Sequence, residues 1–274
     1  MLSHPSAIAH RAFIVFLGNM SDNHIIFTVL IDVAWKYLNF HINLQSFIIG
    51  YSLKKILVII CSVCAIAASG QKPRNGQIYN PDGIEMVFVE GGADSLSSIS
   101  GFYIGKYEVT QAQWKSLMPT NPSNFKSEDN PVENITWDEV KIFIDKLNDS
   151  TGREYRLPTE REWIYAAQEG NGRNPSKYCG SDIIDEVAWY INNSGNTTHP
   201  VGQKKPNALG IYDMTGNVWE WCADCTDLGC TYRVSRGGSW NYTARYCRVS
   251  DRNNYTPTNR NCFLGFRLLL VPDI

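Results

Sequence analysis

Apolar residues recur at helical spacing in three segments of the chain, which predicts three short amphipathic helices. The first segment stops at Pro119, the second ends at Asn148–Gly152, and the third runs from Glu160 to about Glu169, with Gly170 as its stop. The apolar faces of the first two helices consist of Trp114, Leu117 and Met118, and of Trp137, Val140, Ile144 and Leu147.

The start of each predicted helix carries a capping box, a threonine followed three residues later by Glu or Gln. In this motif the two side chains accept hydrogen bonds from backbone N–H groups that the first helical turn leaves free. The pairs are Thr110 with Gln113, Thr136 with Glu139, and Thr159 with Glu162. Each helix is therefore expected to begin directly after its threonine.

Short β-type runs separate these helices. They lie at Met86–Val89, Phe102–Val109, Tyr232–Ser235 and Phe266–Val271. From residue 71 onward there is no internal repeat, charge block or linker-like stretch, which predicts one domain. Few short helices, few short strands and many glycines indicate an α+β fold with much irregular backbone.

Residues 53–70 have the layout of a secretory signal peptide: Lys54 and Lys55, an apolar run over Ile56–Ala68, and small residues near the end. The apolar run is too short to span a bilayer as a helix. We predict that translation begins near Leu53, that residues 1–52 are an extension outside the real protein, and that the mature chain begins between Ala65 and Pro73. The alternative is a membrane anchor that includes the apolar stretches 12–17 and 25–40.

The charge balance excludes one class of partner. With 25 basic and 27 acidic side chains the formal net charge is −2, so there is no excess of basic charge that would indicate a nucleic-acid partner.

Export would place the domain in an oxidising compartment, where its cysteines become disulfide candidates. Disulfides, thiol chemistry at Cys222-x-x-Cys225 and a zinc half-site there all remain open. The domain cysteines are Cys179, Cys222, Cys225, Cys230, Cys247 and Cys262.

Several segments, in order, resemble the formylglycine-generating enzyme, or sulfatase-modifying factor, family. They are KYEVTQAQW (106–114), NPVENITWDEV (130–140), YRLPTEREWIYAA (155–167), NALGIYDMTGNVWEW (207–221), RGGSW (236–240) and LGFRLLL (264–270). The resemblance covers residues 80–271. It implies a single compact domain of the C-type-lectin-like variety, which agrees with the α+β pattern.

The family's oxidases convert a sulfatase cysteine to formylglycine with oxygen and a copper(I) ion held by two thiolates. The second thiolate position of the family matches Cys247, but the first is Tyr242. A phenol is a hard and usually neutral ligand that cannot replace a thiolate on copper(I), so copper is not expected. Ser239 and Trp219 match residues around the family's active pocket, and with Cys247 they are the catalytic candidates. The alternative for Ser239 and Trp219 is a turn hydroxyl and a core indole.

The family's calcium loop maps onto Asp213 and Glu220 through their side chains and onto Gly216 and Val218 through their carbonyl groups. Oxygen donors of this kind suit a structural Ca²⁺ ion, and the resemblance makes calcium the expected cofactor. The alternative is that Asp213 caps a turn and Glu220 pairs with an arginine.

We expect two disulfides in an exported domain. Cys222 is a candidate partner for Cys247, and Cys225 for Cys230 because four intervening residues can close a small loop. An oxidase is disfavoured if Cys247 is bonded to Cys222.

Arginines and aromatic residues interleave near the C-terminus and could contact an anionic or sugar ligand or form framework ion pairs. They are Arg236, Arg245, Arg248, Arg252, Arg260 and Arg267, with Trp240, Tyr242, Tyr246 and Tyr255.

We predict a secreted, periplasmic or cell-surface domain that works as a binding or envelope-assembly module with a protein or glycan partner. The alternative is an oxidoreductase, either a sulfatase maturase with a sulfatase client or a divergent oxidase using Cys247.

Overall fold

The computed structural model describes residues 72–93, 98–170 and 176–272. The chain separates into two units, Met1–Gln71 and Lys72–Ile274, and the described residues all belong to the second. The predicted signal peptide, the predicted extension and the predicted translation start near Leu53 lie outside the described residues. Within the described ranges, no helix has the length and apolar character needed to cross a membrane.

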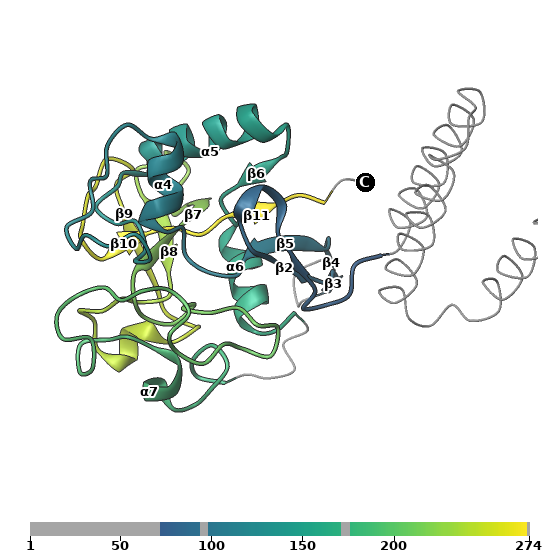
Figure 1. Ribbon diagram of the computed structural model, residues 1–274. Coiled ribbons are helices and arrows are strands. Elements are labelled where there is room, and N and C mark those ends of the chain that lie inside the picture. Colours follow the sequence, from purple (N-terminus) through teal and green to yellow (C-terminus); the bar gives the residue numbers. More distant parts are fainter. Residues whose placement is uncertain (1–71, 94–97, 171–175, 273–274) are drawn as a thin grey trace, which may run out of the picture. The chain divides into compact units, whose positions relative to one another are not determined.

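One antiparallel sheet joins the two ends of the domain. Its strand order is β1-β2-β5-β11-β6, so the C-terminal strand β11 lies between β5 and β6 (Figure 1). A 3₁₀ turn, η1 (Pro81–Gly83), connects its first two strands, and the small pair β3 (Gly92–Ala93) and β4 (Ser98–Ile99) stands apart. The five strands are β1 (Ile78–Tyr79), β2 (Met86–Val89), β5 (Phe102–Gly105), β11 (Leu269–Leu270) and β6 (Tyr155–Arg156).

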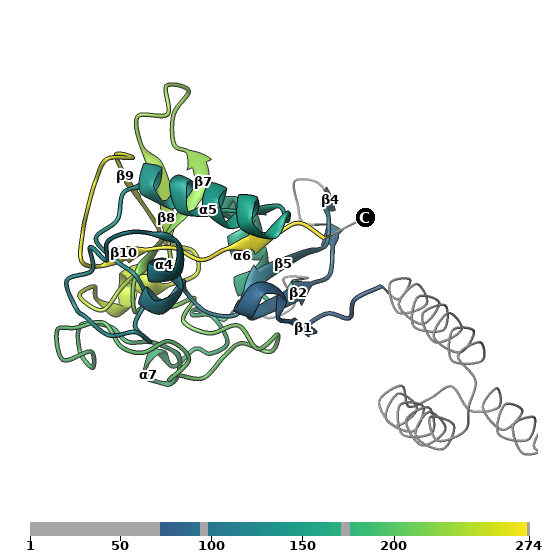
Figure 2. The same cartoon turned by 45° about the horizontal axis from the view of Figure 1, so that its top comes forward.

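A second sheet carries most of the later segments. Its order is β10-β7-β8-β9, with β10 parallel to β7 and the other pairs antiparallel. The strands are β10 (Leu264–Gly265), β7 (Trp219–Cys225), β8 (Arg233–Arg236) and β9 (Arg252–Tyr255). Figure 2 shows the hairpin between β7 and β8 projecting from the rest of the domain.

The three predicted helices are confirmed, and so are their capping boxes. They are α4 (Gln111–Leu117), α5 (Trp137–Thr151) and α6 (Glu160–Ala167), with the short α7 (Ile184–Val187) and the 3₁₀ turn η2 (Ala244–Cys247) in addition. Helix α5 ends at Gly152, whose φ of 68° is left-handed. Helix α6 ends two residues earlier than expected.

The strand prediction is confirmed for Met86–Val89. The predicted strand Tyr232–Ser235 is one residue early, since β8 spans Arg233–Arg236, and the other two predicted strands are too long. The segment 102–109 is a strand only to Gly105, because Gly105 and Val109 both donate backbone hydrogen bonds to the C-terminal segment, with a bend between them. The predicted strand Phe266–Val271 is wrong as a single element. Within it only Leu269–Leu270 is a strand, β11, which pairs with β5 and β6. The residues just before it, Leu264–Gly265, form β10 and pair with β7 in the other sheet.

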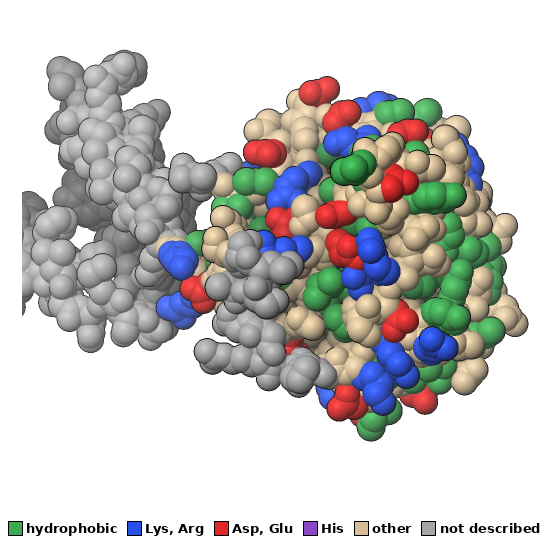
Figure 3. All heavy atoms as spheres, turned by 180° about the vertical axis from the view of Figure 1, so that it is seen from behind, with side chains coloured by type: hydrophobic (Ala, Val, Ile, Leu, Met, Phe, Trp, Pro, Cys, Tyr) green, Lys and Arg blue, Asp and Glu red, His purple; other side chains and the backbone are tan. Residues whose placement is uncertain are grey.

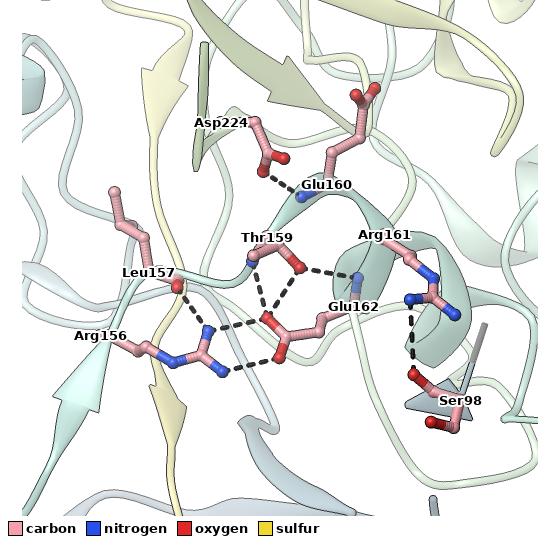
Figure 4. Close-up of polar contacts among 8 residues, drawn as sticks. All are labelled: Ser98, Arg156, Leu157, Thr159, Glu160, Arg161, Glu162 and Asp224. Atoms are coloured by element: carbon pink, nitrogen blue, oxygen red, sulfur yellow. Dashed lines mark hydrogen bonds and ion pairs between the residues drawn. The ribbon is translucent and has the colours of Figure 1, made fainter. Parts of the chain in front are cut away.

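Contacts at its N-terminus attach α6 to the second sheet, as Figure 4 shows. The Glu162 carboxylate accepts from the Thr159 backbone N–H at 2.8 Å and pairs with Arg156 at 2.6 Å. The Asp224 carboxylate, from β7, accepts from the Glu160 backbone N–H at 2.6 Å. These contacts fix the side of α6 that carries Trp163 against β7, where the candidate site begins.

Candidate functional site

Tyr242, which occupies the first thiolate position of the family pattern, lies in a cluster of aromatic rings between β8 and η2. Its ring packs edge-on against Trp219, Tyr246 and Phe263, with centroid distances of 5.4, 5.8 and 5.6 Å. Edge-to-face pairs at such distances stabilise packing beyond the buried area alone. The tyrosine is therefore an integrated packing residue of this region.

The phenol groups of this cluster form a short hydrogen-bond chain. The hydroxyl groups of Tyr242 and Tyr255 lie 3.2 Å apart, and the Asn253 amide donates to the Tyr255 oxygen at 2.8 Å. Burial and the hydrogen bond to Tyr242 raise the pKa of Tyr255 above its usual value. The phenol of Tyr255 is therefore neutral at physiological pH, and the site offers no phenolate there.

Cys247, the second thiolate position, is a free and fully buried thiol. Burial raises the pKa of this thiol to about 12, although the Ser239 backbone N–H acts in the opposite direction. Ser239 is also buried, and its hydroxyl donates to the Asn241 side chain at 2.8 Å. The structure thus brings Tyr242, Ser239 and Cys247 together, but leaves Cys247 protonated and shielded.

The predicted Cys222–Cys247 disulfide is wrong, and both thiols are free. Cys222 packs with Trp163, Val234 and Val249, whereas Cys247 packs in a separate cluster with Tyr178, Val187 and Ala188. The two sulfurs are therefore buried in different clusters of the core. The predicted Cys225–Cys230 disulfide is confirmed and closes the β7–β8 hairpin.

Glu220, at the end of the predicted calcium loop, forms a fully buried ion pair with Arg267. Both of its oxygens accept from Arg267 at 2.6 Å, and one of them also accepts from the Trp163 indole N–H at 2.6 Å. The side chains of Glu220 and Arg267 are both 0% exposed. The arginine pairing that the sequence left open for Glu220 is present.

Asp213 and Gly216, at the start of the loop, hold a tight turn. The Asp213 carboxylate accepts from the Gly202 backbone N–H at 2.7 Å. Gly216 has a φ of 82°, and a Cβ atom there would lie 2.3 Å from the Trp189 carbonyl oxygen. Glycine is required at this position because the backbone of the loop touches the 189 segment directly.

Sequence reasoning missed a third buried carboxylate, Glu108. It accepts from the Val218 backbone N–H at 3.1 Å and from the Asn217 amide at 2.6 Å. Burial and the nearby Asp213 carboxylate raise the pKa of Glu108 well above its usual value, and burial raises the pKa of Asp213 to about 6. The signal in the sequence was an acidic residue within Phe102–Val109, the run that was predicted to be a strand.

The residues fit calcium in charge and in donor type. Glu108, Asp213 and Glu220 place three carboxylates around the single guanidinium of Arg267, and a buried carboxylate excess is stabilised either by protons or by a cation. A cavity of about 10 Å³ is lined by Glu108, but none of the residues predicted to bind calcium lines it. Within the described residues, however, no three His, Cys, Asp or Glu side chains converge on one point.

The C-terminal arginines mostly form framework ion pairs. Arg236 and Arg252 both pair with Glu160, Arg260 with Glu139, and Arg267 with Glu220. Arg245 instead lies over the Tyr246 ring, 5.8 Å from its centroid. On the face drawn in Figure 3, basic and acidic side chains are interspersed, so this face presents no field of one sign.

A family model and several known proteins are similar to this chain. Residues 74–271 match the family model of the sulfatase-modifying factor enzyme 1-like domain. The chain is 36% identical to chaperone protein LppX of Paenibacillus barcinonensis, over 79% of this chain and 99% of that relative. It is 29% identical to the formylglycine-generating enzyme of Thermomonospora curvata, over 60% of this chain and 63% of the enzyme, so it spans less than two thirds of that relative.

A solved structure agrees with this match. Treponema denticola variable protein 1 is 31% identical, with a TM-score of 0.63, and the similarity covers 72% of this chain and 99% of that one. The resemblance of sequence and the arrangement of short helices, mixed sheets and long loops thus lead to the same fold. The chain belongs to the sulfatase-modifying factor enzyme 1-like domain family and has its α+β, C-type-lectin-like fold.

Proposed function

We propose that this domain is a binding or envelope-assembly module that contacts a protein or glycan partner, and that it has lost the two-thiolate oxidase centre. The observation that carries the proposal is Tyr242, which stands where the family has a thiolate and is packed against Trp219 and hydrogen bonded to Tyr255. The remaining thiol, Cys247, is buried and has its pKa raised to about 12. Neither position offers the soft anionic ligand that copper(I) prefers.

The partner would contact what we name the Tyr242 surface: Ile191, Tyr242, Arg245 and Tyr246. Ile191 and Tyr246 are 43% and 45% exposed, and the Ile191 backbone N–H donates to the Tyr242 carbonyl at 3.1 Å. An exposed ring beside a guanidinium suits the apolar faces and polar edges of a sugar or a peptide. The relative LppX is named a chaperone protein, which also favours binding over chemistry.

A matched pair of variants tests the Tyr242 surface. Tyr246→Ala is expected to weaken capture of envelope glycans or envelope proteins by at least tenfold, as is usual for a central aromatic contact. Tyr232→Ala removes a ring of similar exposure, 42%, on the β7–β8 hairpin and is expected to leave binding unchanged. A glycan array and crosslinking in envelope extracts separate the two partner classes. Equal binding by both variants would contradict the assignment of this surface.

The second candidate is an oxidoreductase that matures sulfatases, favoured by the 29% identity to a formylglycine-generating enzyme and by the retained Cys247. Its test is incubation with copper(I), oxygen and a peptide of the Cys-x-Pro-x-Arg pattern, followed by mass spectrometry. We expect the peptide cysteine to survive. Conversion of this cysteine to an aldehyde would replace the binding proposal by the enzymatic one.

We also propose a structural calcium ion held by the side chains of Asp213 and Glu220 and the carbonyl groups of Gly216 and Val218. The excess of buried carboxylates around Arg267 supports this calcium ion.

We propose a secreted, periplasmic or cell-surface location, which is supported by the Cys225–Cys230 disulfide because such bonds persist in oxidising compartments. Fractionation of cells with detection of the intact chain tests the location.

A further inference from the structure

The disulfide at the base of the β7–β8 loop has two sulfurs in different surroundings. Cys230 is exposed, whereas Cys225 is half-buried at the end of β7. The hairpin that carries them projects from the domain, as Figure 2 shows. A reagent from solution therefore reaches Cys230 more readily than Cys225.

A guanidinium group faces the less exposed sulfur. Arg233 Nη1 donates to the Cys225 sulfur at 2.9 Å and to the Ala223 carbonyl oxygen at 2.9 Å. The guanidinium also stacks on the Trp137 ring of α5, with its central carbon 3.8 Å from the ring centroid. Contacts with α5 and β7 thus hold the cation beside the sulfur.

No carboxylate neutralises this cation in the described part of the chain. Arg233 forms no ion pair there, and its Nε atom is buried without a hydrogen-bond partner. The two acidic side chains of the hairpin are engaged by backbone groups: Asp224 accepts from the Glu160 N–H at 2.6 Å, and Asp227 from the Thr231 N–H at 2.8 Å. The charge of Arg233 is therefore available to the sulfur.

We propose that Cys225–Cys230 is a thiol–disulfide exchange site, in which an external thiolate attacks the Cys230 sulfur and Cys225 leaves as a thiolate stabilised by Arg233. The attack forms a mixed disulfide on Cys230 and breaks the internal S–S bond, whose electron pair moves to Cys225. A second thiolate then attacks the mixed disulfide and releases Cys230. The protein gains two electrons, and two thiols of the reductant become one disulfide.

The direction of this reaction follows from access and from charge. An exposed sulfur is attacked faster, and a thiol with a lower pKa is the better leaving group. A cation within hydrogen-bond distance favours the thiolate form of a cysteine. Both effects select Cys230 as the attacked sulfur and Cys225 as the leaving sulfur.

Hydrogen bonds of the loop keep the two cysteines close after reduction. The Thr226 N–H donates to the Tyr232 carbonyl at 3.0 Å, and the Cys230 N–H donates to the Asp227 carbonyl at 3.2 Å. These bonds do not involve the sulfurs. The reduced pair is thus positioned to close again, and exchange at this site is reversible.

The first test maps the attacked sulfur in the full, unmutated chain. After native blocking of accessible free thiols with N-ethylmaleimide, the protein is treated with limiting reduced glutathione, quenched with iodoacetamide and analysed by peptide mass spectrometry. We expect glutathione on Cys230 and the alkyl group on Cys225. Glutathione mainly on Cys225, an equal distribution, or no exchange overturns the proposal. A parallel arm with a dithiol protein of the thioredoxin class distinguishes the two sources of thiolate.

The second test changes the charge at position 233. Arg233→Gln is expected to slow reduction by glutathione about threefold for each unit by which the Cys225 pKa rises, whereas Arg233→Lys keeps a cation and a rate closer to the original. The Cys225 pKa is read from alkylation rates in a Cys230→Ser, Cys262→Ser background, where we expect Arg233→Gln to raise it by about one unit or more. Melting curves confirm folding. Equal rates and equal pKa values in the Gln and Arg proteins overturn the role of Arg233, and the mapping decides the site if the Gln variant does not fold.

Discussion

At the scale of single residues, the Glu133 carboxyl group is fully buried with only one oxygen hydrogen bonded. Its Oε1 accepts from the Phe125 backbone N–H at 2.8 Å, while Oε2 has no partner. Burial raises the pKa of Glu133 to about 7. Because the folded-state pKa lies above the unfolded value, the folded chain binds the additional proton at mildly acidic pH, and stability falls as pH rises through this window.

Glu133→Gln removes this titration. We expect the free energy of unfolding of the original chain to fall by about 1 to 3 kcal/mol between pH 5 and pH 8 on account of this group, and the Gln variant to lack that part of the decrease. Urea denaturation at a series of pH values measures it. If the free energy of unfolding depends on pH in the same way in both proteins, ionisation of Glu133 does not destabilise the folded chain.

Gly238 shows how closely the backbone approaches the buried Cys247 thiol. Its φ is 80°, and a Cβ atom there would lie 2.5 Å from the sulfur and 2.7 Å from the Cys247 Cα. Gly238→Ala is therefore expected to lower the free energy of unfolding by about 3 kcal/mol or more. Gly152→Ala is the matched control, since its φ of 68° is similar but nothing lies within 4 Å; we expect only about 1 kcal/mol there. Equal losses in denaturant titrations would argue against steric exclusion.

At the scale of elements, the capping box at Thr136 starts the long helix α5. The Thr136 hydroxyl accepts from the Glu139 N–H at 3.1 Å, and the Glu139 carboxylate accepts from the Thr136 N–H at 2.9 Å. We expect Thr136→Ala to lower the free energy of unfolding by about 1 kcal/mol. Thr243→Ala is the control because Thr243 precedes η2 without a side-chain cap. Chemical denaturation compares the free energies of unfolding of the two variants. Equal losses would show that the capping box at Thr136 does not stabilise α5.

Local signals predicted the elements that local contacts stabilise. The three helices were found because each has its cap and its apolar face in one short stretch, and Met86–Val89 was found because it is a central strand with all four residues buried. The last strands were not found correctly. Residues 264–270 contribute β10 to one sheet and β11 to the other, and the strands that pair with them lie far away in the sequence. The apolar content of this segment alone therefore does not predict where β10 ends and β11 begins.

The same limit applies to cysteine pairing. The predicted disulfide between Cys225 and Cys230, which are separated by four residues, is confirmed. Cys222 and Cys247 are far apart in the sequence and pack in two different clusters of the core. A disulfide across long sequence separation requires the fold to bring two Cβ atoms together. The sequence gives the number of residues between Cys222 and Cys247 but not the distance between their Cβ atoms.

At the scale of the whole molecule, the buried carboxylate cluster joins parts of the chain that lie far apart. Glu108 follows the first sheet, Asp213 lies in a long loop, Glu220 begins β7, and Arg267 lies between β10 and β11. The family resemblance identified Asp213 and Glu220 from one continuous motif. Glu108 and Arg267 could be assigned to the cluster only once the fold placed them there, so the resemblance predicted half of the charged groups that decide its electrostatics.

The cluster determines how the calcium proposal is best tested. Glu220→Gln would weaken the ion pair with Arg267 whether or not an ion binds, so Asp213→Asn is the more informative variant. An ion that binds only the folded chain stabilises it by about 2.7 kcal/mol at a hundredfold excess over Kd, and removal of calcium with a chelator should therefore lower the Tm. We expect Asp213→Asn to abolish this calcium dependence while the circular dichroism spectrum is retained. If the unmutated chain melts at one temperature with added calcium and after verified removal of all metal, the buried carboxylates are stabilised by protons and not by an ion.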